Sequence, residues 1–489
     1  PAQQKFAVIE LDGRDHDYAQ ARLVKLTAEG EKVIKNISTT PWEGNFLRYN
    51  YLKADFTDVT EAGLYKIRYK DSVSPTFRIG SDVLDRGVWQ PVLEYFLPVQ
   101  MCHMRVSEKY RIWHDACHLD DAQMAQEGNH IDGYDQKEGI PCKLEVHETG
   151  HGLNVGGWHD AGDFDLRVES QAGECYILAL AWEEFQPEID VTAIDQHSKK
   201  VEIHEADGRN DLLQQVEHGA LSVVNGYLAL GRLYRGIICP SLRQYVLLGD
   251  AAAMTDNIPG NEDDRWVFTE NNPGREITTA ANLAATARVL KGFNDTLAVH
   301  CENIAKEIFE ATAETRPGMK LQAAAELYIT TGAEEYMDYI TSNWDSVTGS
   351  VDRNGWFMAR VAKKMEGQKK YRKLTARWNE ALQEYKTRLE EQTSATPYGV
   401  PYTPDIWGAG WSIQNFGFNH YFLVSSYPEV FSADPVTNSM NFVLGCHPGS
   451  NQASFASGVG AQSATVGYGL NRADWSYIPG GVISGTALI

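Results

Sequence analysis

The chain has 489 residues, of which 43% are hydrophobic and 22% are charged, a composition typical of a globular protein with room for more than one domain. Its 66 acidic and 44 basic side chains give a formal net charge of -22, which disfavours nucleic acid as a partner because a phosphate backbone would be repelled. No apolar run reaches the roughly 18 residues of a membrane span, so no such span is predicted.

Residues 6–80 carry short runs in which apolar and polar side chains alternate, separated by polar turns. Examples are Phe6-Ala-Val-Ile-Glu-Leu and Gly63-Leu-Tyr-Lys-Ile-Arg-Tyr. Alternation with a period of two is typical of strands buried on one face, so this segment predicts a small β-sandwich. We expect a domain boundary near residue 82, with domains over residues 1–82 and 83–489.

After Asp82 the pattern changes to helical periodicity, beginning with Val88-Trp-Gln-Pro-Val-Leu-Glu-Tyr-Phe-Leu, and the remainder is expected to be predominantly helical. Helices are predicted over residues 212–233, 278–293, 296–315, 320–331 and 360–391, the last with a break near Gly367. They come in pairs, and small residues are abundant in 279–290, as where two helices approach closely. This favours a barrel of α-hairpins, although periodicity alone does not separate it from an α-solenoid.

The segment Gly156-Gly-Trp-His-Asp-Ala-Gly-Asp-Phe-Asp places Asp160 and Asp163 three residues apart around a small Ala-Gly pair. In a turn, this spacing lets both carboxylates reach one water molecule, and the glycines leave room for a bulky substrate. Inverting glycosidases need a carboxylate base on one face of the sugar and a carboxylic acid on the other, roughly 6.5 to 9.5 Å apart. Taken alone, the spacing is also typical of a helix cap or a calcium loop.

The whole string resembles the Gly-Gly-Trp-(Tyr/His)-Asp-Ala-Gly-Asp signature of glycoside hydrolase family 9. Other stretches resemble the same family, namely Asn210-Asp-Leu-Leu-Gln, Thr278-Thr-Ala-Ala-Asn-Leu-Ala-Ala and Val400-Pro-Tyr-Thr-Pro-Asp-Ile-Trp-Gly-Ala-Gly-Trp. The likeness covers roughly residues 83–489. It implies a mainly α fold, with an (α/α)6 barrel as catalytic domain, preceded in one subgroup by a small immunoglobulin-like β-sandwich that would be residues 1–82 here.

The resemblance implies an endo-acting enzyme that hydrolyses β-1,4-glucosidic bonds of cellulose, mixed-linkage glucan or xyloglucan with inversion. Asp163 would be the general base, and Asp160 would help to hold the attacking water. The family's general acid is a Glu near the C-terminus, whereas no glutamate follows Glu429 here, so we expect this chain to be truncated before it. If the acid were truly absent, the same groove would make a non-catalytic glucan-binding protein.

A second constellation joins two thiols and two imidazoles, the donor set of a closed and therefore structural zinc site. Scattered cysteines and histidines do not by themselves predict a metal. The resemblance implies that zinc is held by Cys102, Cys117, His118 and His159. Since His159 directly precedes Asp160, the metal would pin the loop that carries the catalytic carboxylates. Calcium is also frequent in the family.

The remaining assignments concern substrate and surroundings. The calcium candidates are Asp211 and Glu217, and the substrate-binding candidates are Trp407, Trp411, Tyr402 and Arg472. Aromatic rings offer flat faces for stacking on sugars, and Trp407 falls in the segment most similar to the family's substrate loop. Core packing is the expectation for Trp158. The expected partner is a β-glucan polysaccharide or oligosaccharide, and the expected location is extracytoplasmic.

A competing motif is His147-Glu-Thr-Gly-His151, which matches the His-Glu-x-x-His pattern of zinc proteases. That chemistry requires both histidines on one face of a stable helix. The surrounding sequence alternates like a strand, and Gly150 and Gly152 each disfavour a helix by about 1 kcal/mol. A metalloprotease is therefore a remote alternative.

Overall fold

A computed structural model describes residues 3–120, 122–149, 152–160, 164–239, 255–259, 261, 263–465 and 477–485. The chain divides into two compact units, the first made of residues 1–93, 351–467 and 477–489, and the second of residues 94–350 and 468–476. Within the described ranges no helix combines the length and the apolarity that crossing a membrane would require. Both units mix helices with strands.

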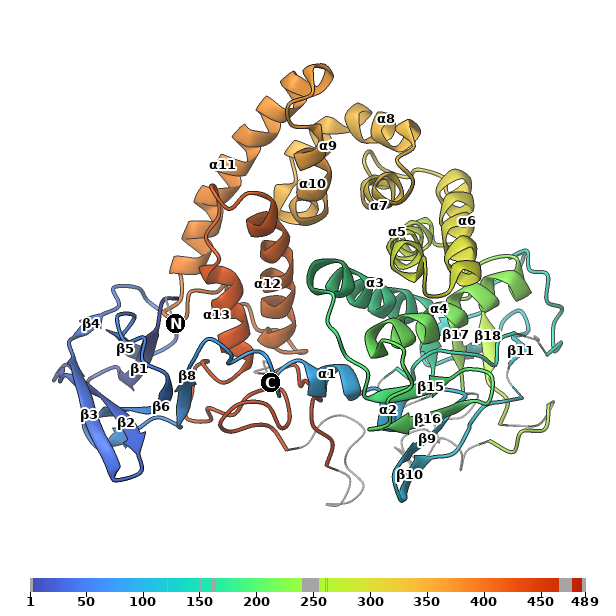
Figure 1. Cartoon of the computed structure of the whole chain (residues 1–489). Helices are drawn as coiled ribbons and strands as arrows, with labels where there is room; N and C mark the ends of the chain where they lie inside the picture. Colours follow the sequence, from blue (N-terminus) through green and yellow to red (C-terminus); the bar gives the residue numbers. More distant parts are fainter. Residues whose placement is uncertain are drawn as a thin grey trace. The chain divides into compact units, whose positions relative to one another are not determined.

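The first unit begins with two antiparallel sheets (Figure 1). Their strands are β1 (Phe6–Asp12), β2 (Ala21–Thr27), β3 (Gly30–Ile37), β4 (Thr39–Pro41), β5 (Tyr49–Asp55), β6 (Gly63–Tyr69), β7 (Ser72–Val73) and β8 (Phe77–Ile79). One sheet has the order β1-β5-β4, and the other has the order β3-β2-β6-β7, with β8 also paired to β6. The alternating pattern therefore does form strands, as predicted.

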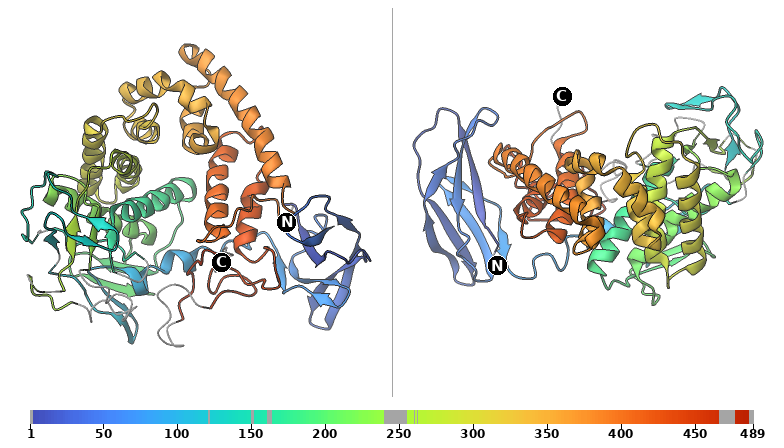
Figure 2. Two further views of the ribbon diagram at one scale, coloured as in Figure 1. Left: turned by 180° about the vertical axis from the view of Figure 1, so that it is seen from behind. Right: turned by 90° about the horizontal axis from the view of Figure 1, so that it is seen from above.

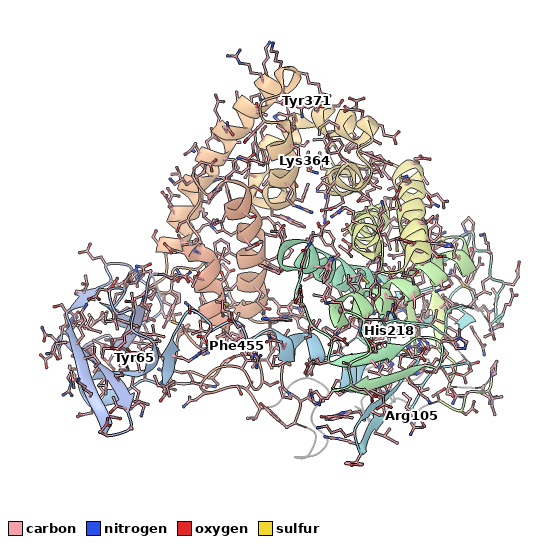
Figure 3. All side chains as sticks on the ribbon, in the orientation of Figure 1. Tyr65, Arg105, His218, Lys364, Tyr371 and Phe455 are labelled. Atoms are coloured by element: carbon pink, nitrogen blue, oxygen red, sulfur yellow. The ribbon has the colours of Figure 1, made fainter. Side chains whose placement is uncertain are left out.

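A single apolar core lies between these two sheets. Leu23 of β2 and Tyr65 of β6 come from one sheet, Leu52 and Ala54 of β5 come from the other, and none of the four is exposed (Figure 3). The period of two in each strand turns these side chains to the same face, which is what closes a β-sandwich. The predicted β-sandwich is confirmed.

The same unit contains the later helices α10 (Val351–Met365), η3 (Lys369–Tyr371), α11 (Arg372–Ser394), α12 (Ala409–Ser426) and α13 (Asp434–Val443). Helix α12 packs against both α10 and α13, and α10 also contacts α11. Phe46 and Tyr51 do not belong to the core between the two sheets. They form a separate apolar cluster with Ile413 of α12 and Phe442 of α13. The sandwich is thus fixed to the helices of its own unit by buried aromatic side chains.

The second unit carries the helices α2 (Leu97–Gln100), α3 (Val168–Phe185), α4 (Asp211–Leu230), α5 (Pro273–Leu290), α6 (Asp295–Ala311), α7 (Leu321–Thr331), α8 (Glu334–Ser342) and α9 (Trp344–Thr348), while α1 (Gln90–Glu94) straddles the unit boundary. Successive helices pair as α3 with α4, α5 with α6 and α7 with α8. Helix α5 also contacts α3 and α7, and α4 contacts α6, which gives an inner and an outer row (Figure 2). Paired rows of this kind are the layering of an (α/α)6 barrel, which is the fold class predicted.

The observed ends of α4 to α7 lie within about five residues of the predicted ones, whereas α10 begins at Val351, nine residues before the predicted start at residue 360. The break near Gly367 is present, since α10 ends at Met365 and α11 begins at Arg372. Helix α5 begins earlier than predicted because the Asn272 side chain caps it by accepting from the N–H of Arg275.

The prediction that helices dominate directly after residue 82 is wrong for residues 101–167. Pro91 and Pro98 sit in α1 and α2, which stay short, and the first long helix begins only at Val168. The strands of this region and those that pair with them are β9 (Arg105–Glu108), β10 (Arg111–His114), β11 (Gln123–Met124), β12 (His130–Ile131), β13 (Tyr134–Asp135), β14 (Leu166–Arg167), β15 (Thr192–Asp195), β16 (Lys200–Ile203), β17 (Gly236–Ile238) and β18 (Trp266–Phe268). Strands of two to four residues are too short to show a period in the sequence.

Candidate active site and metal centre

The segment Gly156–Asp160 is held by hydrogen bonds to the last residue of α2 and to the chain just after it. The carbonyl oxygen of Gly157 accepts from the N–H of Cys102 at 2.9 Å. The N–H of His159 donates to the carbonyl of Gln100 at 2.7 Å, and the side-chain amide of Gln100 donates back to the carbonyl of His159 at 2.8 Å. These bonds fix the segment before it reaches Asp160.

Trp158 anchors the same segment in the protein interior, since it is only 1% exposed. This burial agrees with the expectation that Trp158 is a core residue. The side chain of Gln171 on α3 satisfies both backbone polar groups of Trp158, at 2.8 Å each. A Cβ atom at Gly219 of α4 would lie 2.3 Å from the ring, so α4 needs glycine there. His218, also on α4, donates from Nε2 to the carbonyl of Gly157 at 2.7 Å, and burial lowers the pKa of His218 to about 3, which keeps it neutral (Figure 3).

Asp160 begins a short loop whose two ends are hydrogen-bonded to each other. The N–H of Asp160 donates to the carbonyl of Asp165 at 2.8 Å. Residues 161–163 lie outside the described residues, so the predicted base Asp163 belongs to this loop by sequence alone.

The carboxylate of Asp160 is paired with Arg167, a residue that no sequence motif indicated. Arg167 Nε lies 2.9 Å from Asp160 Oδ2 and 3.1 Å from Asp165 Oδ2. The Tyr134 hydroxyl donates to the same Asp165 oxygen at 3.1 Å. Burial is the main reason that the pKa of Asp160 rises to about 6, with the charge of Asp165 adding to the rise and Arg167 opposing it.

Glu174 is a second perturbed carboxyl, two turns into α3. Its Oε2 atom is shielded from solvent and has no hydrogen-bond partner among the described residues. Burial, followed by the negative charge of Asp160, raises the pKa of Glu174 to about 8. Glu174 is therefore mostly protonated at neutral pH.

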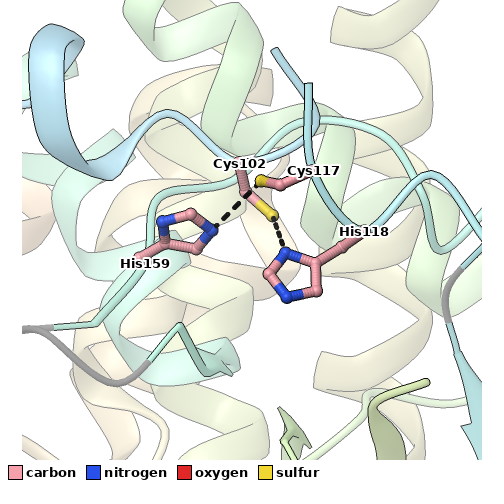
Figure 4. Close-up of side chains that lie close together, drawn as sticks. All are labelled: Cys102, Cys117, His118 and His159. Atoms are coloured by element: carbon pink, nitrogen blue, oxygen red, sulfur yellow. Dashed lines mark hydrogen bonds between the residues drawn. The ribbon is translucent and has the colours of Figure 1, made fainter. Parts of the chain in front are cut away.

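Two thiols and two imidazoles converge beside the segment, as the family resemblance implied (Figure 4). All four side chains are buried, and their ligand atoms lie within 4.8 Å of one another. The Cys117 Sγ atom lies 3.6 Å from His159 Nε2, and the Cys102 Sγ atom lies 3.9 Å from His118 Nδ1. The set is Cys102, Cys117, His118 and His159.

These separations fit a tetrahedral zinc ion. Zn–S and Zn–N bonds of about 2.3 and 2.0–2.1 Å at tetrahedral angles place a sulfur and a nitrogen ligand about 3.6 Å apart. The Nδ1 atom of His159 is buried without a hydrogen-bond partner among the residues that the structure describes, while its Nε2 atom faces Cys117. The donor set is that of a structural zinc site with no ligand position left open.

The two thiols differ in their affinity for protons. Burial alone would raise the pKa of Cys102, but the hydrogen bond to Cys117 and the charge of Arg265 outweigh it and hold that pKa well below its usual range. Burial and the hydrogen bond to Cys102 hold the pKa of Cys117 well above its usual range. A thiolate is thus already favoured at Cys102, and a thiolate is the form that binds a metal ion.

The predicted substrate-binding aromatics lie in the first unit, whereas Asp160 and the thiols lie in the second. Trp407 and Trp411 are 64% and 58% exposed, on either side of the start of α12. Tyr402 is partly buried and packs edge-on against Phe46, with ring centroids 5.3 Å apart. Arg472 lies outside the described residues.

Both calcium candidates are engaged by protein groups. The Asp211 carboxylate accepts from the backbone N–H groups of Val191 and Thr192. Glu217 pairs with Arg209 at 3.0 Å and accepts from the Asn294 side chain at 2.7 Å. Neither residue belongs to a group of possible metal ligands in the described part of the chain, and calcium stays a prediction.

A separate acidic group has oxygen atoms within 4.8 Å of one another and consists of Asp120, Asp256 and Asp263. The Asp263 carboxylate accepts from the N–H of Asp256, and the Asp120 carboxylate accepts from the Thr255 hydroxyl. Protein donors therefore already engage the carboxylates of Asp120 and Asp263.

The described part of the protease motif, His147–Thr149, does not form a helix. His147 has φ of 61°, in the left-handed region, and Thr149 forms an isolated bridge to Gln123. Gly150 and His151 lie outside the described residues. The backbone at His147–Thr149 is therefore incompatible with the helical zinc site that a metalloprotease needs.

Comparison with known proteins gives a consistent result. The model of the family described as Glycosyl hydrolase family 9 matches residues 93–467. Endoglucanase D of Acetivibrio thermocellus is 22% identical over 335 residues, which cover 63% of this chain and 48% of that protein. The chain thus spans about half the length of the curated relatives it matches.

Solved structures share the fold over almost the whole chain. The structure of AaCel9A in complex with cellobiose-like isofagomine has a TM-score of 0.73 at 18% identity, and covers 99% of this chain and 88% of its own. The Zn-binding triple mutant of the family 9 endoglucanase J30 has a TM-score of 0.70 at 19% identity, and covers 99% and 89%. At these identities the likeness shows the fold.

Proposed function

Because the chain belongs to glycosyl hydrolase family 9, we propose that it hydrolyses internal β-1,4-glucosidic bonds of a neutral glucan with inversion of the anomeric centre. The observation that carries this proposal is the Gly156–Asp160 segment, which is pinned on both sides and delivers a carboxylate that is 31% exposed. The name of the relative Endoglucanase D and the cellobiose-like ligand bound to AaCel9A support a β-glucan as the substrate.

In the proposed reaction, Asp163 removes a proton from water as the water attacks the anomeric carbon. Asp160 orients the same water molecule, and Arg167 keeps the Asp160 carboxylate in one position. A protonated carboxylic acid on the opposite face must donate to the leaving oxygen. No residue of this chain is assigned that role, since no glutamate follows Glu429.

We assign Cys102, Cys117, His118 and His159 to a structural zinc ion. When bound, zinc would supply a rigid tetrahedral cross-link rather than a step in hydrolysis. The Cys102 and His159 ligands lie on the two backbone segments that hydrogen-bond to each other beside Asp160. The Zn-binding triple mutant of endoglucanase J30 supports zinc as a metal compatible with this fold.

The remaining proposals concern organisation and surroundings. Residues 1–82 would form an immunoglobulin-like module that buttresses the barrel domain of residues 83–489, and the Phe46 and Tyr51 contacts to α12 and α13 support this role. Trp407 and Trp411 would stack on sugar rings, because both are exposed and lie on either side of the start of α12. A secreted or cell-surface location would bring the enzyme to its polymeric substrate.

The test uses protein from the complete reading frame, incubated with mixed-linkage β-glucan and with xyloglucan. Reducing ends and the product anomer, observed by NMR, are measured for the wild type and for Asp163→Ala and Asp160→Asn. We expect initial α-anomer release and a loss of about 10²- to 10⁴-fold in kcat for Asp163→Ala. Asp338→Asn, a change of an exposed carboxylate on α8, is the matched control and should retain full activity.

Two results would contradict the proposal. Release of the β-anomer would exclude inversion. Undiminished glucan binding without any release of reducing ends would favour a non-catalytic glucan-binding protein.

A further inference from the structure

Arg265 is a fully buried arginine next to the metal centre. It directly precedes β18, and its carbonyl accepts from the N–H of Gln123 at 2.9 Å. Strand β18 lies within the sheet β11-β18-β17-β14, so the arginine has a rigid base. Burying a guanidinium is costly unless its N–H groups are hydrogen-bonded, so its partners indicate why it is there.

The guanidinium of Arg265 contacts a metal ligand and the active-site loop at once. Its Nη2 atom lies 3.3 Å from the Sγ atom of Cys102. The same Nη2 atom lies 3.3 Å from Nε2 of His103. Its Nη1 atom donates to the carbonyl oxygen of Phe164, the residue that follows Asp163. One planar cation thus joins three groups, which a lysine ammonium on a flexible stem is poorly suited to do.

His103 extends this connection to the other end of the segment. Its Nδ1 atom lies 2.9 Å from the carbonyl oxygen of Gly156, which can only accept, so Nδ1 carries the proton. The Nε2 atom lies 3.3 Å from Nη2 of Arg265, which can only donate, and 3.6 Å from the Cys102 sulfur. His103 is also fully buried, and its φ of 64° lies in the left-handed region, so the backbone is shaped to place this ring.

We infer that Arg265 and His103 are positioning residues that clamp the catalytic loop to the metal centre. They connect the Cys102 sulfur to Gly156 and to Phe164, which flank the loop carrying Asp160 and Asp163. A hydrogen bond to a metal-bound thiolate fixes its direction and strengthens the site. The inference rests on the zinc site in the proposed function and adds a route from that site to the reacting carboxylates.

The experiment compares Arg265→Gln, Arg265→Lys and His103→Asn with the wild type, in protein from the complete reading frame. Asn tolerates the left-handed backbone of residue 103 and keeps a donor for Gly156, but offers Arg265 no equivalent ring nitrogen. The control is Arg232→Gln, because Arg232 bonds to Pro141, Glu270 and Asn271, none of which is a metal ligand. Zinc retention is measured by chelator competition, and the cobalt-substituted proteins give thiolate-to-metal absorption spectra.

We expect Arg265→Gln to weaken zinc retention about 10- to 100-fold and to shift the cobalt–thiolate band. With zinc saturating, kcat on β-glucan should fall while KM holds, since the loop is displaced but the sugar-binding surface is intact. Arg265→Lys should recover part of the zinc retention and little of the kcat. His103→Asn should lower kcat with a smaller loss of zinc retention.

A wild type that binds neither zinc nor cobalt would overturn the proposed metal site itself. A wild type that binds both, with Arg265→Gln and His103→Asn matching Arg232→Gln in retention, spectrum and kcat, would overturn the clamp alone. If Arg265→Gln fails to fold, the test relies on Arg265→Lys and His103→Asn. Cobalt–thiolate spectra and kcat values equal to those of the wild type in both variants would again overturn the clamp.

Discussion

Glu174 carries a carboxyl group that holds its proton to an unusually high pH. Burial and the nearby Asp160 carboxylate raise the pKa of Glu174 to about 8, above the value of about 4.3 expected in an unfolded chain. The folded protein therefore binds one more proton than the unfolded chain between these two values. Its contribution to stability is full below pH about 4.3 and is lost as the pH rises through 8.

Glu174→Gln should remove this dependence, because an amide has the shape of the protonated carboxyl without its ionisation. Between pH 5 and 8 the wild-type free energy of unfolding should fall, relative to the variant, by up to about 1.4 kcal/mol per pH unit. Denaturant unfolding at several pH values measures this. Glu188→Gln, at an exposed position, is the control, and parallel curves for wild type and Glu174→Gln would contradict the prediction.

The sequence identified the four thiol and imidazole residues, but only through family resemblance, because His159 lies 57 positions after Cys102 and no local pattern joins them. Arg167 and Arg265 were missed for a related reason. Arg167 is an ordinary charged residue in the sequence, and its pairing with Asp160 depends on how the loop folds back. Arg265 lies more than one hundred residues from each group it contacts.

At the level of elements, long helices were predictable and short strands were not. Helices α4 to α7 and the α10–α11 break repeat apolar residues over several turns, which a window of the sequence detects. Strands β11 and β14 have two residues each. They form because β11 pairs with the distant strand β18 and β14 pairs with the distant strand β17. Tertiary pairing, rather than local pattern, decides such strands.

Helix α4 depends on one glycine to receive the tryptophan beneath the active-site segment. Gly219→Ala would place a methyl group 2.3 Å from the Trp158 ring and 2.6 Å from the Cys175 sulfur. We expect a loss of about 1–3 kcal/mol in the free energy of unfolding, with lower kcat because Trp158 directly precedes His159.

Gly173→Ala on α3 is the matched change, since an added Cβ atom there meets nothing within 4 Å. Replacing that helical glycine should stabilise the protein by about 0.5–1 kcal/mol. Thermal and denaturant unfolding of both variants measures the contrast. Equal effects at the two positions would show that helix propensity, and not packing on Trp158, controls the outcome.

For the whole molecule, the formal net charge of -22 predicts a preference among soluble glucans. An anionic derivative such as carboxymethyl cellulose should be repelled at low ionic strength, whereas a neutral β-glucan should not. Raising salt from about 0.01 to 0.15 M shortens the Debye length from about 30 to 8 Å and should lower KM for the anionic polymer only. A matching change in KM for both polymers would contradict this view.

The first unit is also discontinuous along the chain, and this sets an order of events during synthesis. At about 5–20 residues per second, translation of residues 94–350 takes roughly 10 to 50 seconds, during which the sandwich has already emerged without α12 and α13. The core between the two sheets of the sandwich is complete at that time. Phe46 and Tyr51, however, are buried only after Ile413 and Phe442 have been synthesised. The nascent chain therefore exposes the aromatic side chains of Phe46 and Tyr51 for tens of seconds. We expect a chaperone to bind this early folding intermediate.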